Sequence, residues 1–257
     1  MGTLLLGTSG WDYPEWVGKV YPVRGVADKL RYYASIFPIV EVNSTFYRLP
    51  PPAVAVSWAK RTPARFRFAA KFPRTITHDL RLEGTEGELA RFLEVLKPLR
   101  AAGKFVAALL QLPPSLPFDS ATVRSFYAAL PRDLPVAVEF RERSWLVPES
   151  YSLLREFGLA NVIVDGPHLP VALEVTAPFA YVRWHGHGTR VWYDYTYSAA
   201  ELAAWVPRVH ELGQRAEAVY GFFNNHFRGD AAANCRTLAE ELGVPLSSSP
   251  TRRPLDV

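Results

Sequence analysis

The stretch VAVEFR at residues 136–141 alternates apolar side chains with small or charged ones. In a β-strand alternate residues share a face, so the two valines and Phe140 would cover one face of this strand. Ala137, Glu139 and Arg141 would occupy the other face, with the charges at the carboxyl end. A small residue suits the crowded interior of a closed barrel, and charges at the strand end suit the barrel mouth, where active sites are built.

Two other hydrophobic runs end on polar pairs with the same spacing, Glu41 with Asn43 and Arg183 with His185. In both runs the apolar residues between the polar positions would face a layer of helices. The three runs therefore predict one architecture, in which strands from distant parts of the chain point polar groups into a common opening. The same pairs would also suit salt bridges or turns that tie strands together, so the pattern alone does not decide their role.

Strand and helix patterns alternate along the whole chain. Eight runs rich in β-branched or apolar residues are predicted strands: 4–8, 39–43, 66–71, 105–112, 136–140, 161–165, 181–185 and 218–224. Helical spacing predicts helices at 26–36, 52–61, 85–100, 119–130, 148–157, 198–212 and 230–242, with no clear helix after Asp165. Capping boxes are predicted at Thr85 with Glu88 and at Ser198 with Glu201, and Asp230 is the predicted cap of the last helix.

Alternation of strands and helices predicts parallel strands joined by crossovers. Eight such units in 257 residues favour an α/β fold with a single (β/α)₈ TIM-type barrel spanning residues 1–257. A doubly wound open sheet remains the alternative. Hydrophobic residues make up 49% and charged residues 21% of the chain, which is ordinary for a folded domain.

Charge and cysteine content bear on the partners of the protein and on its cellular compartment. The net charge of +4 is small and spread along the chain, so it lends only weak support to a nucleic-acid partner. The single cysteine, Cys235, excludes an intrachain disulfide and favours a reducing compartment. Residues 1–7 lack the pattern of a signal peptide, and no run is long enough to span a bilayer. We expect a cytoplasmic protein without a membrane partner; its oligomeric state is left open.

Four residues at predicted strand ends are candidates for catalysis: Glu41, Glu139, Asp165 and His185. Carboxylates and imidazoles are the usual proton-transfer groups of enzymes. Burying such groups without partners would cost several kcal/mol each, about enough to unfold a marginal domain, so they must pair or meet a ligand. Either outcome predicts a polar pocket at the mouth.

Candidate substrate-binding residues surround the same opening: Trp11, Asn43, Tyr47, Lys71, Gln111, Arg141, Arg183, Asn224 and Asn225. The arginines suit an anionic group, and the aromatic rings suit stacking on a sugar or a base. Lys71 would act as an electrostatic clamp or, if it loses contact with water, as a Schiff-base amine.

No metal, dinucleotide or phosphate-loop motif is present in the sequence, so no cofactor is evident. A divalent metal held by Glu139, Asp165 and His185 stays open as a hypothesis.

Several strings of the sequence resemble the YecE-like family, also called domain of unknown function family 72. They are GTSGW at 7–11, EVNSTFY at 41–47, QLP at 111–113, EFR at 139–141 with SW at 144–145, YVRWHG at 181–186 and FNNH at 223–226. The resemblance covers nearly the whole chain and implies a TIM-type barrel, but it implies no reaction. A likeness to endonuclease IV-type barrels is an analogy of fold and site shape.

Three functions remain as hypotheses. The first is a hydrolase or lyase acting on an anionic, phosphorylated or sugar-like compound, with Glu41 and Glu139 moving protons and His185 as acid, base or polariser. The second is a metal-dependent phosphodiesterase that binds nucleic acid. The third is a small-molecule binding module without catalysis.

Overall fold

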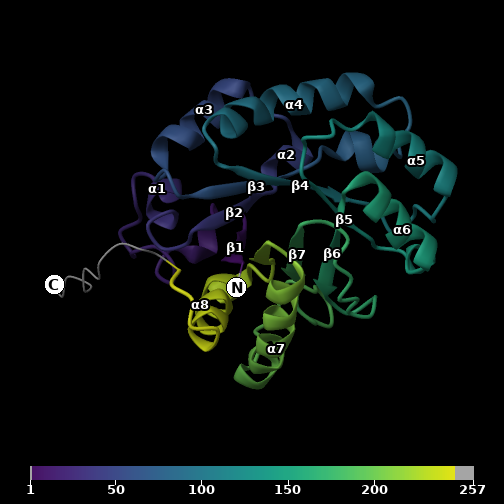
Figure 1. Ribbon diagram of the computed structural model, residues 1–257. Helices are drawn as coiled ribbons and strands as arrows, with labels where there is room; N and C mark the ends of the chain where they lie inside the picture. The colour runs from purple at the N-terminus through teal and green to yellow at the C-terminus, as the bar shows by residue number, and fades with distance from the viewer. Residues whose placement is uncertain (1, 247–257) are drawn as a thin grey trace.

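Eight parallel strands form one closed barrel in the structure, a computed structural model that describes residues 2–246. The strands follow chain order around the ring, and the last pairs with the first (Figure 1). Their bounds are β1 Thr3–Ser9, β2 Ile39–Val42, β3 Arg67–Lys71, β4 Phe105–Gln111, β5 Val136–Glu139, β6 Ala160–Asp165, β7 Phe179–Trp184 and β8 Ala218–Phe223. The predicted TIM-type barrel is confirmed, and each predicted strand overlaps an observed one.

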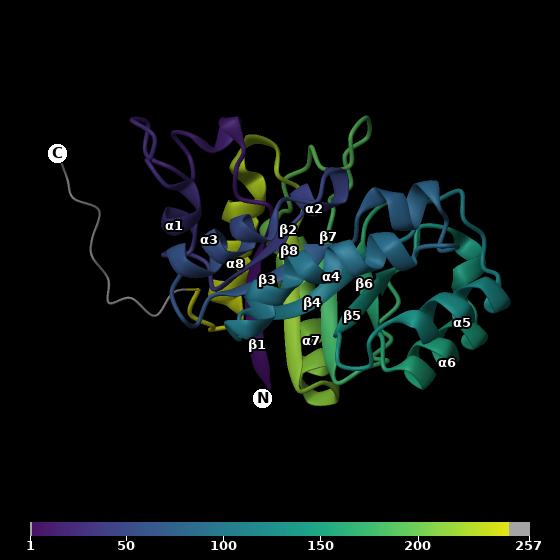
Figure 2. The same ribbon diagram turned by 90° about the horizontal axis from the view of Figure 1, so that it is seen from above.

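Helices surround the barrel on its outside (Figures 1 and 2). Their bounds are α1 Lys29–Tyr33, α2 Ser44–Tyr47, α3 Pro52–Arg61, α4 Glu86–Ala101, α5 Ser120–Ala129, α6 Pro148–Phe157, α7 Ala199–Arg215 and α8 Asp230–Glu241. Short turns lie in the loops, at η1 Pro14–Trp16, η2 Thr75–Asp79, η3 Arg143–Trp145 and η4 Phe227–Gly229. None of the helices within residues 2–246 has the length and apolar character needed to cross a membrane.

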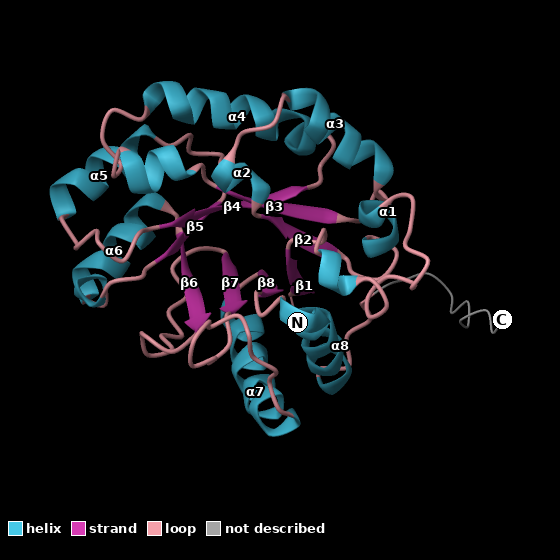
Figure 3. Ribbon diagram, turned by 180° about the vertical axis from the view of Figure 1, so that it is seen from behind, coloured by secondary structure: helices cyan, strands magenta, loops and turns pink. Residues whose placement is uncertain are grey.

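One crossover has no helix. Residues 166–178 run from β6 to β7 as loop, and Figure 3 shows coil beside β6 where the other strands have helices. The sequence predicted this gap, because no helical spacing follows Asp165.

Helix starts were predicted less accurately than helix positions. Ser198 and Glu201 form the expected reciprocal capping box of α7. Thr85 precedes α4 but makes no side-chain cap, and the carboxylate of Glu88 pairs with Arg91. Asp230 is the first residue of α8 and not its cap, since Gly229 takes the cap position with a left-handed backbone. The box predicted at Thr85 and the cap predicted at Asp230 are therefore wrong.

The interior of the barrel is filled by small and apolar side chains that alternate with those packed under the helices. The interior cluster includes Ile39, Ala69, Leu109, Ala137, Val162, Tyr181 and Phe222. Two residues further along six of the strands, the inward positions are polar: Glu41, Lys71, Gln111, Glu139, Arg183 and Asn224. The alternation of a strand thus places apolar residues at the centre and polar residues at the carboxyl end.

Gly7 shows how tightly β1 and β2 approach each other near this end. A Cβ atom on Gly7 would lie 2.1 Å from the carbonyl oxygen of Ile39, which is far inside contact distance. Only glycine fits at this position, because the backbone of β2 occupies the space of a side chain. The close approach leaves room for larger polar groups above it.

Candidate active site

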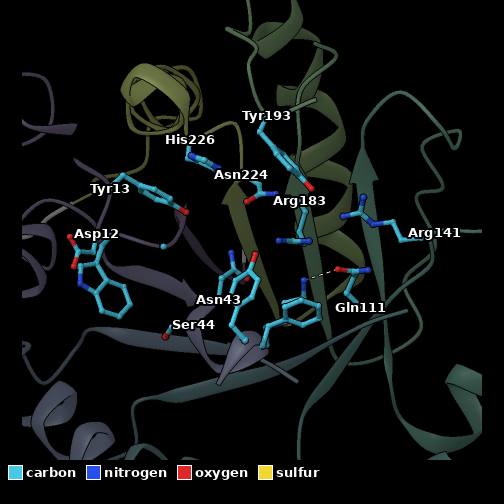
Figure 4. A pocket seen from close by; sticks show the side chains of 15 residues that line it. Asp12, Tyr13, Asn43, Ser44, Gln111, Arg141, Arg183, Tyr193, Asn224 and His226 are labelled. Carbon is cyan, nitrogen blue, oxygen red and sulfur yellow. Dashed lines mark hydrogen bonds between the residues drawn. The ribbon is translucent and has the colours of Figure 1, made fainter. Parts of the chain in front are cut away.

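A cavity of about 620 Å³ opens at the carboxyl end of the barrel. Its lining residues come from the ends of β1 to β5, β7 and β8 and the loops that follow: Gly10, Trp11, Asp12, Tyr13, Asn43, Ser44, Phe46, Tyr47, Lys71, Gln111, Arg141, Arg183, Tyr193, Asn224 and His226. Figure 4 shows Asn43, Gln111, Arg141, Arg183 and Asn224 around one opening. Eight of the nine predicted binding residues therefore line it, the exception being Asn225.

Below this cavity, one arginine joins two carboxylates from opposite sides of the barrel. Arg183 donates from Nη2 to Oε1 of Glu41 at 2.7 Å and from Nη1 to Oε2 of Glu139 at 2.5 Å. Tyr181 donates its hydroxyl to the other oxygen of Glu41 at 2.7 Å. Both carboxylates are fully buried, and Arg183 is 2% exposed. The strands β2, β5 and β7 are thus linked through their charges.

Charge pairing fixes the protonation of this network. Burial would raise the pKa of Glu139, but Arg141 and Arg183 together hold it well below its ordinary value. Burial would lower the pKa of Arg183, but Glu139 and Glu41 outweigh burial and raise it. Glu139 is therefore ionised at neutral pH, and neither glutamate lines the cavity. Their expected role as proton carriers does not agree with this placement, which suits the positioning of arginines.

His185 lies in the same buried layer and carries no charge at neutral pH. Burial, followed by the charges of Arg141 and Arg183, lowers its pKa to about 3. Its Nε2 lies 3.3 Å from Oε1 of Glu139 and 3.0 Å from Nη2 of Arg141, and its Nδ1 lies 2.9 Å from Nδ2 of Asn224. The neutral ring carries one N–H, so it accepts a hydrogen bond at one nitrogen only, from Arg141 at Nε2 or from Asn224 at Nδ1, at the floor of the cavity.

Lys71 faces the cavity from the end of β3. Its Nζ donates to Oε1 of Gln111 at 2.6 Å and lies 3.9 Å from the ring centre of Phe46. Gln111 is itself oriented, because its Nε2 donates to the carbonyl of Leu112 at 2.8 Å. Burial, followed by the charge of Arg183, lowers the pKa of Lys71 to about 7. A substantial fraction of this amine is therefore neutral at physiological pH.

Arg141 completes the cationic wall. It forms an ion pair with Glu139, and its guanidinium lies 5.1 Å from the ring centre of Trp192. Only 11% of its side chain is exposed, so little water competes with a ligand for its donors.

An aromatic group that the sequence reasoning missed lines the opposite wall. Tyr13 stacks on His226 with ring centres 4.4 Å apart. Tyr193 also stacks on His226, with ring centres 5.9 Å apart. The hydroxyl of Tyr13 donates to the carbonyl of Ser9. These residues lie in loops after β1, β7 and β8, where no periodicity fixes direction. The string FNNH at 223–226 was the one available signal for His226.

The expected convergence is wrong for Asp165. Val162 and Val164 of β6 face the barrel interior, so Asp165 faces the helices. Its oxygens accept hydrogen bonds from Nε1 of Trp205 at 2.6 Å and lie 2.6 Å from Nε2 of His187. Asp165 therefore ties β6 to α7 and to the loop after β7.

Asn225 also points away from the cavity. It donates to the carbonyl of Tyr195 at 2.9 Å and to the side chain of Asn234 at 2.8 Å. It anchors the loop after β7 to α8, and it is not among the residues that line the cavity.

The three donors considered for a metal ion do not gather in this geometry. Glu139 and His185 lie inside the barrel, whereas Asp165 lies outside it, so the three donors do not surround one point. Within residues 2–246 no group of three histidine, cysteine or acidic side chains is arranged to hold a metal ion.

These observations define a class: a TIM-type barrel protein whose mouth carries arginines, a lysine and amides above a buried layer of ion pairs. The chain belongs to the family described as protein of unknown function DUF72, whose model matches residues 5–254. The resemblance to YecE-like proteins is thereby confirmed.

Related proteins align with this chain over nearly their full length. UPF0759 protein YunF of Bacillus subtilis (strain 168) is 29% identical over 97% of this chain and 98% of its own. UPF0759 protein YecE of Escherichia coli (strain K12) is 27% identical over 93% of this chain and 92% of its own. A DUF72 family protein from Thermotoga maritima superposes with a TM-score of 0.86 at 33% identity, covering 94% of this chain and 99% of that one.

A more distant structure shares the fold alone. A xylose isomerase domain protein from Alicyclobacillus acidocaldarius has a TM-score of 0.50 at 15% identity and covers 95% of this chain and 98% of that one. At this identity the likeness carries no information about the reaction.

Proposed function

We propose that this protein is an enzyme that binds a small anionic compound, phosphorylated or sugar-like, at the mouth of the barrel and performs lyase or hydrolase chemistry on it. One observation carries the proposal. Lys71, Arg141 and Arg183 face one cavity. Glu41 and Glu139, which balance the charge of the two arginines, lie behind them and out of the cavity. Such a wall attracts an anion while the carboxylates keep the arginines fixed.

The size and other linings of the cavity suit the same class of ligand. A volume of about 620 Å³ fits a small molecule and is within the usual range of enzyme pockets. Asn43, Gln111 and Asn224 bring amide groups that recognise hydroxyls. Trp11 and Tyr47 lie at the rim, where rings stack on sugars or bases.

The positions of these side chains support a different assignment of roles. Arg141 and Arg183 bind the anionic group, Glu41 and Glu139 position them, and neutral His185 orients Arg141. Lys71 is the cavity group whose pKa suits a base or a nucleophile near neutral pH.

The first test is a calorimetric titration with inorganic phosphate. Wild type should bind phosphate, and Arg141→Met should weaken binding at least about tenfold, the loss expected for one charge-assisted contact. Arg124→Met is the matched control, because Arg124 forms an exposed ion pair with Glu156 far from the cavity. Equal affinities in all three proteins, each shown to be folded by circular dichroism, would contradict the proposal.

Turnover separates an enzyme from the alternative binding module. Phosphorylated sugars and oxo acids offered to wild type and to Lys71→Met should be converted by the wild type alone, while Lys71→Met should still bind phosphate through Arg141 and Arg183, more weakly than wild type. Tight binding of an oligonucleotide, with hydrolysis that depends on added Mn²⁺, would instead support the phosphodiesterase.

A further inference from the structure

Lys71 differs from the other cations of the mouth in its partners. Arg141 and Arg183 both contact carboxylates, but Lys71 forms no ion pair within residues 2–246, and its amine bonds to the neutral amide of Gln111. The two nearest inward carboxylates, Glu41 and Glu139, are occupied by arginines. A buried amine at a cavity without a counterion is suited to lose its proton.

We propose that Nζ of Lys71 is a nucleophile that forms an imine with the carbonyl carbon of an anionic aldehyde or ketone bound in the cavity. The inference rests on the proposed function and names its substrate class, phosphorylated carbonyl compounds or oxo acids. Arg141 and Arg183 would hold the phosphate or carboxylate on the wall that they share with Lys71.

The step balances without an oxidant or a reductant. The lone pair of the neutral amine attacks the carbonyl carbon, and one proton moves from nitrogen to the former carbonyl oxygen, which gives a carbinolamine. The C–O bond then breaks, and the hydroxyl group takes up a proton and leaves as water. The resulting iminium withdraws electrons from a neighbouring C–C or C–H bond, which is what a lyase requires.

The surroundings of Lys71 agree with this chemistry. The face of Phe46 lies against the amine and excludes water from one side, while Gln111 holds it by a single hydrogen bond. Asn43, just after the neighbouring strand β2, lines the same cavity, and its buried Oδ1 has no hydrogen-bond partner within the described chain. The amide group of Asn43 is thus available beside the site where the hydroxyl of a carbinolamine would form.

Lys104 provides an internal comparison. It is also buried, but its Nζ donates to the carbonyls of Ala59 at 2.6 Å and Thr62 at 2.7 Å and to the hydroxyl of Thr62 at 3.1 Å. All three of its hydrogens are used, and it lines no cavity that Lys71 lines. Burial lowers the pKa of Lys104 as well, but three acceptors hold its amine, whereas a single acceptor holds the amine of Lys71.

The experiment traps the imine chemically. Wild type at about pH 7 is incubated with glycolaldehyde phosphate or with glyoxylate, reduced with sodium borohydride, and analysed by peptide mass mapping. In parallel, the anionic amine reagent trinitrobenzenesulfonate reports which lysine is nucleophilic without need of a carbonyl. Both reactions should modify Lys71 at least about tenfold faster than the exposed Lys60 and Lys97, because a lysine of ordinary pKa is almost entirely protonated at this pH.

Two variants and one competitor complete the design. Lys71→Arg should lose the adduct, and Lys104→Arg should keep it. Inorganic phosphate should slow the modification of Lys71 and leave that of Lys60 unchanged. If neither the aldehydes nor trinitrobenzenesulfonate prefers Lys71, the inference is overturned.

The outcomes also separate the two proposals. Phosphate binding that persists in Lys71→Arg, combined with no preference for Lys71 in either reaction, overturns the imine and leaves the anion site standing. Trapping at Lys71 that phosphate does not slow would support the nucleophile and contradict the anion site.

Discussion

Arg183 is the residue on which the order of the mouth depends, because it holds two buried carboxylates from distant strands. Glu139→Gln would remove one charge and leave Arg141 and Arg183 without full compensation in a buried site. We expect a loss of about 3–5 kcal/mol in the free energy of unfolding, as for other broken buried ion pairs. Urea denaturation followed by circular dichroism measures it.

Glu156→Gln is the control, because it breaks an ion pair with Arg124 in which both side chains are about half exposed. Exposed pairs contribute little, so this variant should lose far less stability than Glu139→Gln. Similar losses in the two variants would show that the buried network is not specially important.

The pKa of His185 predicts how stability depends on acid. In the folded protein it is lowered from 6.5 to about 3, so between these values the unfolded chain binds a proton that the folded protein does not. Stability therefore falls as pH falls through this window, by up to about 1.4 kcal/mol per pH unit from this group. His185→Gln should flatten the slope relative to wild type, whereas exposed His210→Gln should leave it unchanged. Parallel curves for His185→Gln and wild type would contradict this assignment.

At the residue level the sequence predicted most of the mouth, because polar and apolar residues alternate clearly at the ends of β2, β5 and β7. The prediction failed for Asp165, since β6 has Val162 and Val164 on one face and Ile163 on the other. Because both faces of β6 are apolar, the sequence pattern does not indicate which face of this strand, and thus which way Asp165, points into the barrel. The low pKa of Lys71 was equally unpredictable, because it depends on Phe46 and Arg183 from other elements.

Among the elements, the loop after β7 is anchored on the side away from the cavity by Asp165, at the end of β6. Asp165→Asn should weaken the contacts to Trp205 and His187 and cost about 1–3 kcal/mol of unfolding free energy, the usual loss for a buried hydrogen-bonded group. Phosphate affinity should change less than about threefold, since this side chain faces away from the cavity. Calorimetry measures the affinity, and urea denaturation of the same preparation measures the stability. A large loss of affinity with unchanged stability would show that Asp165 contributes to phosphate binding.

Element positions were predictable because periodicity is a property of local sequence, and the eight strands and the missing helix after β6 follow from it. Helix caps were less predictable. Thr85 and Glu88 have the spacing of a capping box, but Arg91 competes for the carboxylate. Ser198 and Glu201 form the box through Oε2 of Glu201, although the hydroxyl of Tyr195 donates to its Oε1.

For the whole molecule, Cys235 offers a direct report on opening of the barrel. This thiol is fully buried in α8, and burial raises its pKa, so it is both shielded and protonated. We expect an aromatic disulfide reagent to label it only through unfolding, at a rate that rises steeply with urea. Inorganic phosphate should slow the labelling if it binds the native mouth. Fast labelling in the absence of urea would contradict the packing of α8 on the barrel.

The ring of charges under the mouth also has a consequence for synthesis. Glu41 leaves the ribosome 142 residues ahead of Arg183, the one basic side chain that pairs with it among residues 2–246. At ordinary elongation rates this separation corresponds to roughly 7–30 s. Until then the nascent barrel cannot bury the first glutamate at an acceptable energy, so its early strands must stay hydrated or be shielded by a chaperone. The third quarter of the translated chain thus determines when the first quarter can become native.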